Sequence, residues 1–165
     1  MAVKRILTPL GMLFLGFGLG ILARLFDIYT EHLGKMFSQM AIWILLGTLI
    51  SIYSRTPKLA MENVFCFCIG MLLTYYAVAA LTDGVYGTIY IIGWTAFGLC
   101  SPILAYFAWL TKGKGLFPKL IGARIVLVSV LSSVVLFDRL RFYDLVIDGL
   151  LVYVLFFNQD LRRVK

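Results

Sequence analysis

Two carboxylates near the C-terminus are the residues of this chain best placed to do chemistry. Asp144 and Asp148 fall in an apolar segment four residues apart, and a helix puts residues at that spacing on one face. Asp148 lies ~10 Å beyond Arg141 along such a helix. Membrane segments rarely bury ionisable groups unless these serve a pathway, a ligand or a partner. We interpret both as a polar wall of a ligand cavity. The alternative is a hydrogen bond to a neighbouring helix that only fixes packing.

Other polar and aromatic side chains fall at a similar depth in neighbouring apolar segments. Tyr75, Trp94, Thr95 and Ser129 complete, with the two carboxylates, the ligand-binding set that we predict. Ligand pockets are mostly apolar and aromatic with a few placed polar groups, and this set has that make-up. The competing interpretation is structural, because Ser and Thr commonly join membrane helices and Tyr and Trp commonly form interfacial belts.

Gly16 and Gly20 in the first apolar segment form a GxxxG pair, which lets another backbone approach closely. One interpretation is a docking face for a membrane partner subunit or for a second copy of this chain. The other is close packing inside the same helix bundle. In a later segment, Ser101-Pro102 predicts a kink, because proline interrupts the helical hydrogen bonds.

Motifs of soluble enzymes are absent, and we expect no catalytic residue, no cofactor and no metal. The single histidine, His32, forms no HExxH motif, and no phosphate-binding or dinucleotide-binding loop is present. Cys66 and Cys68 are two residues apart, so a helix points them to nearly opposite faces and we treat them as small buried hydrophobes. The dipeptides Tyr143-Asp144 and Asp148-Gly149 resemble fragments of the motifs of intramembrane aspartyl proteases. Those proteases place their carboxylates on different helices, which disfavours a hydrolase here.

The composition fixes the environment of the protein. Of the 165 residues, 62% are hydrophobic and only 14% are charged, and the mean hydropathy is +0.97. Soluble domains are about half apolar and a quarter charged. These values exclude a soluble enzyme, a disordered protein and a disulfide scaffold. We expect a multi-pass protein of the cell membrane, with the lipid bilayer as its first partner.

Six apolar segments are long enough to predict membrane-spanning helices, because a span needs ~20 residues. We expect an all-α bundle of six helices in one integral membrane domain that covers residues 1–165. The predicted helices are residues 6–26, 36–53, 59–81, 85–110, 116–137 and 142–157. Thr56-Pro57 is a typical cap and first helical position for the third helix. Residues 27–38 are expected to form the longest loop.

The basic residues predict how the helices are oriented. The formal net charge is +7, and the Lys and Arg side chains sit in short clusters between apolar runs, which favours topology signals over nucleic-acid binding. More of these clusters fall on the side of the N-terminus, as at Arg55, Lys58, Lys112 and Lys114, so both termini are expected in the cytoplasm. The first segment has no small-residue cleavage site, and we expect a retained helix.

Several short stretches together resemble uncharacterised small six-helix membrane proteins of Gram-positive bacteria. These stretches are Ser54-Arg55-Thr56-Pro57-Lys58, Cys68-Ile69-Gly70-Met71, Gly93-Trp94-Thr95, Ser101-Pro102-Ile103 and Val135-Leu136-Phe137-Asp138. The architecture is also similar, more loosely, to the S components of energy-coupling-factor transporters. That likeness implies a ligand near the outer face and a partner subunit that docks on the first helix, where Gly16 and Gly20 stand. This chain shows no vitamin-specific loop signature.

These observations predict a membrane-embedded subunit that binds or transports a small molecule through a pocket in its outer half. The alternative is a membrane scaffold, an immunity protein or a partner subunit without transport activity. In that case the polar groups only tie helices together.

Overall fold

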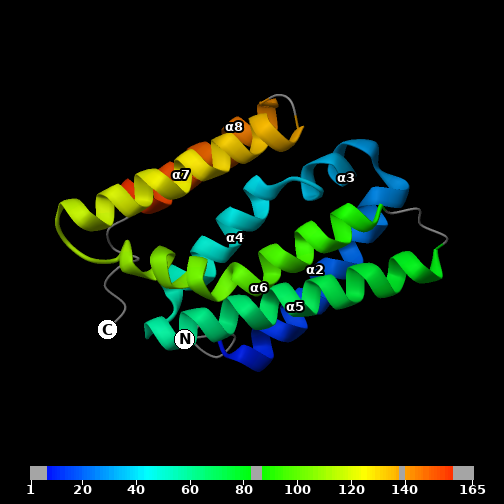
Figure 1. Cartoon of the computed structure of the whole chain (residues 1–165), viewed down its shortest axis with the longest axis horizontal. Coiled ribbons are helices and arrows are strands. Elements are labelled where there is room, and N and C mark those ends of the chain that lie inside the picture. Colours follow the sequence, from blue (N-terminus) through cyan, green and yellow to red (C-terminus); the bar gives the residue numbers. More distant parts are fainter. Residues whose placement is uncertain (1–6, 83–86, 138–139, 158–165) are drawn as a thin grey trace.

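The computed structural model describes residues 7–82, 87–137 and 140–157, and this part of the chain is helical without any strand (Figure 1). In chain order the helices are α2 (Pro9–Tyr29), α3 (Glu31–Phe37), α4 (Met40–Tyr53), α5 (Pro57–Leu81), α6 (Thr88–Leu110), α7 (Leu116–Phe137), α8 (Phe142–Val152) and the π-helical turn η1 (Tyr153–Phe157). The expectation of an all-α chain is therefore confirmed.

Four helices, α2, α5, α6 and α7, are long and apolar enough to cross a membrane. Many of their large hydrophobic side chains are exposed, as on a surface that faces lipid. Helix α4 has 14 residues and α8 has 11. At 1.5 Å per residue, α4 rises ~21 Å, which is less than the ~30 Å of a bilayer core.

Two of the long helices begin in the same way, with a threonine followed by proline. The hydroxyl of Thr8 accepts a hydrogen bond from the backbone N–H of Gly11 (3.2 Å), and that of Thr56 accepts from Leu59 N–H (3.1 Å). Proline suits the first helical position because its missing N–H would have no partner there. The cap predicted at Thr56-Pro57 is confirmed.

The segment between the first two predicted helices is not a loop. Helix α2 continues to Tyr29, and α3 follows after one residue, Thr30. The Thr30 hydroxyl and backbone N–H both donate to Phe26 O, and the Ser38 hydroxyl donates to Gly34 O (2.8 Å). These local bonds satisfy the helix ends, and Gly34 lets α3 fold back against Asp27. A Cβ at position 34 would lie 2.9 Å from Asp27 Cα.

Helices α2 and α5 make the closest contact in the molecule. A Cβ added at Gly16 would lie 2.3 Å from Phe67 O, and one at Gly20 would lie 2.3 Å from Met71 O. From the other side, a Cβ at Gly70 would lie 2.5 Å from Leu13 O. The two backbones touch because these glycines carry no side chain. The structure thus shows the second interpretation stated for Gly16 and Gly20, close packing inside the bundle, because both are buried against α5 of the same chain.

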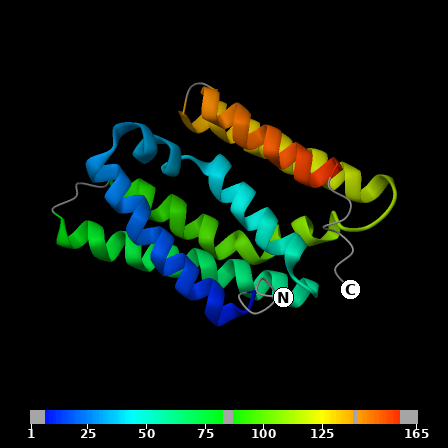
Figure 2. The same ribbon diagram turned by 180° about the vertical axis from the view of Figure 1, so that it is seen from behind.

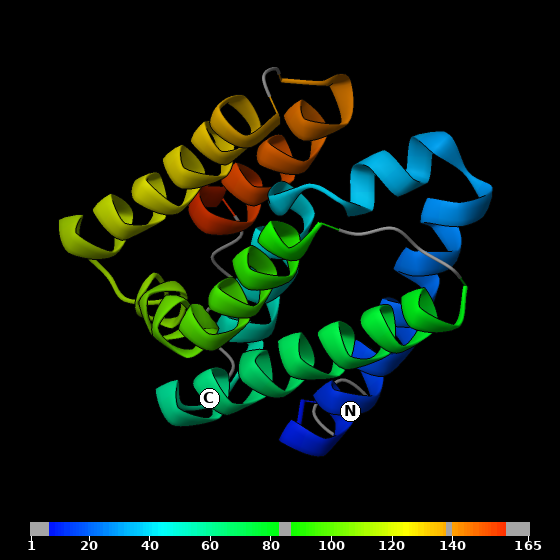
Figure 3. The same cartoon turned by 45° about the vertical axis from the view of Figure 1, so that its right-hand side comes forward.

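Helix α6 continues through Pro102. Proline at this position donates no hydrogen bond to the carbonyl of Gly98, and the hydroxyl of Ser101 donates to that carbonyl instead (2.7 Å). Figure 3 shows that the axis of α6 changes direction between its green first half and its yellow-green second half, near this point. The predicted kink is thus present, and a neighbouring hydroxyl satisfies the carbonyl that proline leaves without a donor.

Helices α7 and α8 form an antiparallel pair that lies beside α4 (Figure 2). The buried apolar side chains of this contact come from α4, α8 and η1: Ala41, Leu45, Ile147, Leu151 and Leu155. A separate and larger core joins α2, α4, α5 and α6 around Trp43, Phe67 and Met71. Helix α4 therefore contributes to both cores and connects the two parts of the bundle.

At the end of α4, the backbone carbonyl of Ser54 accepts hydrogen bonds from two side chains at the end of α6. Ser54 O accepts from Trp109 Nε1 (3.1 Å) and from Lys112 Nζ (2.9 Å). The Lys112 ammonium also lies 5.2 Å from the centre of the Trp109 indole, and burial lowers the pKa of this lysine. These contacts tie the end of α4 to the end of α6.

Candidate functional site: an aromatic cavity at one end of the bundle

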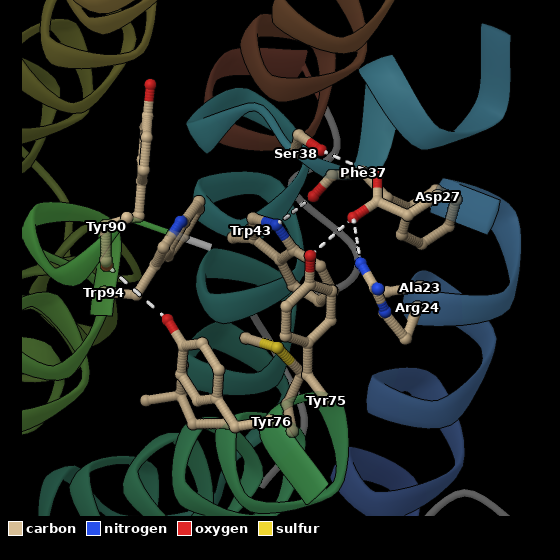
Figure 4. Close-up of a pocket in the computed structure, with 13 residues that line it drawn as sticks. Ala23, Arg24, Asp27, Phe37, Ser38, Trp43, Tyr75, Tyr76, Tyr90 and Trp94 are labelled. Atoms are coloured by element: carbon tan, nitrogen blue, oxygen red, sulfur yellow. Dashed lines mark hydrogen bonds and ion pairs between the residues drawn. The ribbon is translucent and has the colours of Figure 1, made fainter. Parts of the chain in front are cut away.

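A cavity of about 380 Å³ lies at the end of the bundle where α2 and α5 finish and α4 and α6 begin (Figure 4). Helix α3 and Ser38 close one side of it. Volumes from about 300 Å³ upward are usual for sites that take small molecules. The helical hairpins thus bring together, at one level, residues that are far apart in the sequence.

Aromatic side chains form most of the wall. They come from four helices: Phe37, Trp43, Tyr75, Tyr76, Tyr90 and Trp94. Trp43 is buried and its indole N–H donates to Phe37 O (2.8 Å), which fixes the ring as part of the floor. Tyr90 stands at the rim with an exposed side chain, and its carbonyl accepts from the hydroxyl of Tyr76 (3.5 Å). Most of these rings are thus held by the protein in fixed positions.

One corner of the cavity carries charge. Arg24 Nη1 lies 3.8 Å from Asp27 Oδ2, one turn along α2. The same carboxylate accepts a short hydrogen bond from the hydroxyl of Tyr75 and another from Ser38 (3.2 Å). Figure 4 shows these groups on the α2 side, facing Trp94 and Tyr76 across the cavity. Asp27 is therefore the centre of a small network that joins α2, Ser38 and α5.

Arg24 is less well satisfied than Asp27. Its Nε and Nη2 share one acceptor, Thr82 Oγ1, both at 3.4 Å, and its distance to Asp27 is longer than a hydrogen bond. The guanidinium has five N–H donors, and its side chain is only 13% exposed. The guanidinium of Arg24 also lies 6.0 Å from the centre of the Tyr75 ring. Among the described residues, Arg24 thus has more N–H donors than close acceptors, and it is one of the residues that line the cavity.

The structure separates the residues that we predicted as one ligand-binding set. Tyr75 and Trp94 line the cavity. Thr95 follows Trp94 on α6, but its side chain is exposed on the outside of the bundle. Asp144, Asp148 and Ser129 are not among the lining residues and lie in the α7–α8 pair. The prediction grouped these residues because they lie at a similar depth in their helices. Which side chains meet depends also on which helices are neighbours, and α7 and α8 do not border this cavity.

Asp148 forms a packing contact between α7 and α8. Its side chain is buried, and Oδ1 accepts a hydrogen bond from the hydroxyl of Ser129 (2.6 Å). Its Oδ2 is buried and has no hydrogen-bond partner in the part of the chain that the structure describes. The hydroxyls of Ser132 and Ser133 donate to the backbone carbonyl of Ser129 and do not reach the carboxylate. The arrangement is that of an interhelical bond, which is the structural alternative stated above.

Asp144 caps the start of α8 and meets α4. Its Oδ2 accepts from the backbone N–H of Arg141 (2.9 Å). Gln39, at the start of α4, is fully buried beside it. In the amide orientation that satisfies all neighbours, Gln39 donates to both oxygens of Asp144 and accepts from Arg141 Nη1 (3.0 Å) and Tyr143 Oη (3.2 Å). This buried network attaches the first turn of α8 to the first turn of α4.

Sequence reasoning missed the charged corner. Arg24 falls near the end of the predicted helix 6–26 and Asp27 in the predicted loop 27–38, whereas both line the cavity from the last turns of α2. The signal that was available is their spacing, because opposite charges three residues apart on a helix are neighbours. This spacing indicates a pair only if Asp27 belongs to the same helix as Arg24, and α2 does extend to Tyr29.

The described residues contain no group of three or more His, Cys, Asp and Glu side chains that could hold a metal ion. The three cysteines are free thiols: Cys68 is buried as expected, Cys66 is only half-buried, and Cys100 is exposed on α6. No protein-family model, curated protein or solved structure matches this chain. The site must therefore be interpreted from its own chemistry.

Proposed function

We propose that this protein is a membrane-embedded small-molecule binding subunit, which takes its ligand into the aromatic cavity and serves binding or transport. The observation that carries this proposal is the cavity itself, which has six aromatic residues in its wall and one ion pair in one corner. Apolar and aromatic walls with few placed polar groups are the usual make-up of ligand sites. The looser likeness to S components of energy-coupling-factor transporters implies a site of the same kind.

We further propose that all six longer helices cross the membrane and that the cavity opens outward. Helices α2, α4, α5, α6, α7 and α8 alternate in direction between the two ends of the molecule, with α2 and α4 running obliquely (Figures 1 and 2), which supports six passes. The end opposite the cavity carries Arg55, Lys58, Lys112 and Lys114. By the positive-inside rule this end faces the cytoplasm, with both termini on that side.

The binding function is tested by native mass spectrometry of protein extracted gently from its own membrane. We expect a retained small molecule in the wild type and its loss in Trp94→Ala. Tyr106→Ala is the matched control, because Tyr106 is also an aromatic residue of α6 but is exposed outside the cavity. A ligand retained equally in Trp94→Ala, or no ligand in any protein together with a stoichiometric partner, contradicts the proposal and favours the scaffold alternative.

The orientation is tested by cysteine labelling in a variant whose three cysteines are replaced by alanine. Tyr29→Cys lies at the cavity end and Lys114→Cys at the opposite end, and both positions are exposed. A membrane-impermeant maleimide added to intact cells is expected to label position 29, and to label position 114 only after permeabilisation. The reverse pattern would contradict the proposed orientation without affecting the binding proposal.

A further inference from the structure

We propose that the cavity selects an uncharged, flat aromatic or heteroaromatic molecule that carries hydrogen-bond acceptors on one edge. This inference rests on the proposed function and specifies the ligand class of the same cavity. It follows from three properties of the described residues: the charge of the cavity, the balance of donors and acceptors on its wall, and the position of its aromatic rings.

The cavity is electrically balanced before any ligand enters. Arg24 and Asp27 are the charged residues among those that line it, and they pair with each other. Their side chains are only 13% and 24% exposed. A charged ligand would lose part of its hydration beside this partly exposed ion pair and would meet one of the two residues with a like charge. An uncharged ligand avoids both costs.

The wall offers donors and few free acceptors. Oδ2 of Asp27 accepts from Tyr75, and the Ser38 hydroxyl shares its one hydrogen between Gly34 O (2.8 Å) and Oδ1 of Asp27 (3.2 Å). Within the described residues, the contacts of Arg24 to Thr82 are long (3.4 Å), so its N–H groups can donate to a closer acceptor on a ligand. The complementary ligand therefore supplies carbonyl oxygens or ring nitrogens.

The donors and the rings lie in an order that orients the ligand. Figure 4 shows Arg24 and Asp27 on one side and Trp94 with Tyr76 on the other, with Trp43 and Tyr75 between them. A flat ring placed between these aromatic side chains gains stacking and edge contacts, which add to the apolar area that it buries. Its acceptor edge then faces Arg24. A saturated ring of similar size loses the stacking contribution.

The test uses three probes that share one ring system and differ in charge. These are 2-naphthamide, which is neutral, 2-naphthoate, which is anionic, and the 2-naphthamidinium cation. Their binding to the full-length protein in lipid nanodiscs is followed through tryptophan fluorescence. We expect the amide to bind about tenfold more tightly than either ion. Decahydronaphthalene-2-carboxamide, which keeps the amide but is not flat, is expected to bind more weakly than 2-naphthamide.

Two substitutions should reverse this selectivity in opposite directions. Asp27→Asn leaves Arg24 without its counter-charge, so the preference is expected to move to 2-naphthoate. Arg24→Gln leaves Asp27 uncompensated, so the preference is expected to move to the amidinium cation. Circular dichroism and gel filtration verify that each variant is folded. If neither variant folds, the ranking of the probes on the wild type decides alone.

The outcomes distinguish a failure of the proposed ligand class from a failure of the proposed binding function. Tightest binding of an ion by the wild type, or equal binding of the flat and the saturated amide, overturns the inference. Failure of every probe, with a natural ligand still lost in Trp94→Ala, also overturns the ligand class and leaves the binding function standing. Failure of every probe with no Trp94-dependent ligand removes both.

Discussion

The hydroxyl of Tyr75 donates a hydrogen bond to the carboxylate of Asp27, and this bond joins the last turns of α5 to the last turns of α2. The same carboxylate accepts from Ser38, which follows α3. One side chain thus fixes three segments around the cavity. Such a carboxylate shapes the site even without touching a ligand.

Removal of the Tyr75 hydroxyl is expected to loosen the cavity while leaving its ring in place. Tyr75→Phe should lower the free energy of unfolding by ~1–2 kcal/mol, because the bond involves a charged acceptor that is partly buried. Thermal unfolding in detergent, with and without the retained ligand, measures this. Tyr106→Phe is the control, since Tyr106 is exposed on α6. Equal melting temperatures for the two variants would show that the bond adds no stability.

The glycine contact of α2 with α5 should be intolerant of a single methyl group. Gly16→Ala and Gly20→Ala are each expected to destabilise the protein by about 1–3 kcal/mol, because the added Cβ overlaps backbone atoms of α5. Gly18→Ala, between them, is the control, because a Cβ there has nothing within 4 Å. It should leave stability unchanged or raise it by up to ~1 kcal/mol. The three variants are compared by unfolding in mixed micelles. A similar loss of stability in all three variants would mean that the effect of alanine on the helix itself, and not the contact with α5, determines the change.

The Ser129–Asp148 bond is expected to affect stability and not ligand binding. Ser129→Ala removes the one hydrogen-bond donor to the carboxylate among the described residues, so a loss of ~1–3 kcal/mol is predicted. Ser132→Ala serves for comparison, because the Ser132 hydroxyl reaches only a backbone carbonyl. Affinity for 2-naphthamide should be the same in both. A selective loss of affinity in Ser129→Ala would return Asp148 to the list of ligand-binding residues.

The Gln39–Asp144 contact is expected to hold the α7–α8 pair on the rest of the bundle. Gln39→Leu leaves the buried carboxylate without its amide donor, and Gln39→Glu places a second carboxylate against it. Both should increase the rate of limited proteolysis between α7 and α8, and the second more than the first. Thr95→Val, at an exposed position of α6, is the control. Unchanged cleavage in Gln39→Glu would show that the apolar contact with α4 is sufficient by itself.

Much of the fold could be predicted because apolar length and helix-capping signals are local properties. Predicted and observed bounds agree closely for α5 and α7, where Thr56-Pro57 and Lys114-Gly115 mark the starts. Residues 27–38 could not be assigned correctly in the same way. Their helices depend on Gly34 packing against Asp27, which is a contact between segments. The prediction for residues 85 and 86 at the start of the fourth helix lies outside the described residues.

The candidate site could be predicted only in part. The depth of a residue along its helix can be estimated from the sequence, but the neighbours of that helix cannot. Tyr75 and Trp94 were placed at the correct level, and the same argument added Asp148, which lies at a different interface. Arg24 and Asp27 were missed because their side chains sit near a helix end, where charge is ordinary. Which helices are neighbours is decided by shape, here by the glycines of α2 and α5, and no periodicity in one segment reports it.

The pairing of α2 with α5 also dictates an order of events during synthesis. Residues that touch at Gly20 and Met71 are separated in the chain by α3 and α4. A ribosome that adds about 5–20 residues per second needs on the order of several seconds to cover that distance. During this interval the glycine face of α2 has no α5 to pack against, and of the helices made by then α3 is the one that packs on α2 in the final structure. Helix α2 therefore reaches its final neighbour only after two further helices, α3 and α4, have been made.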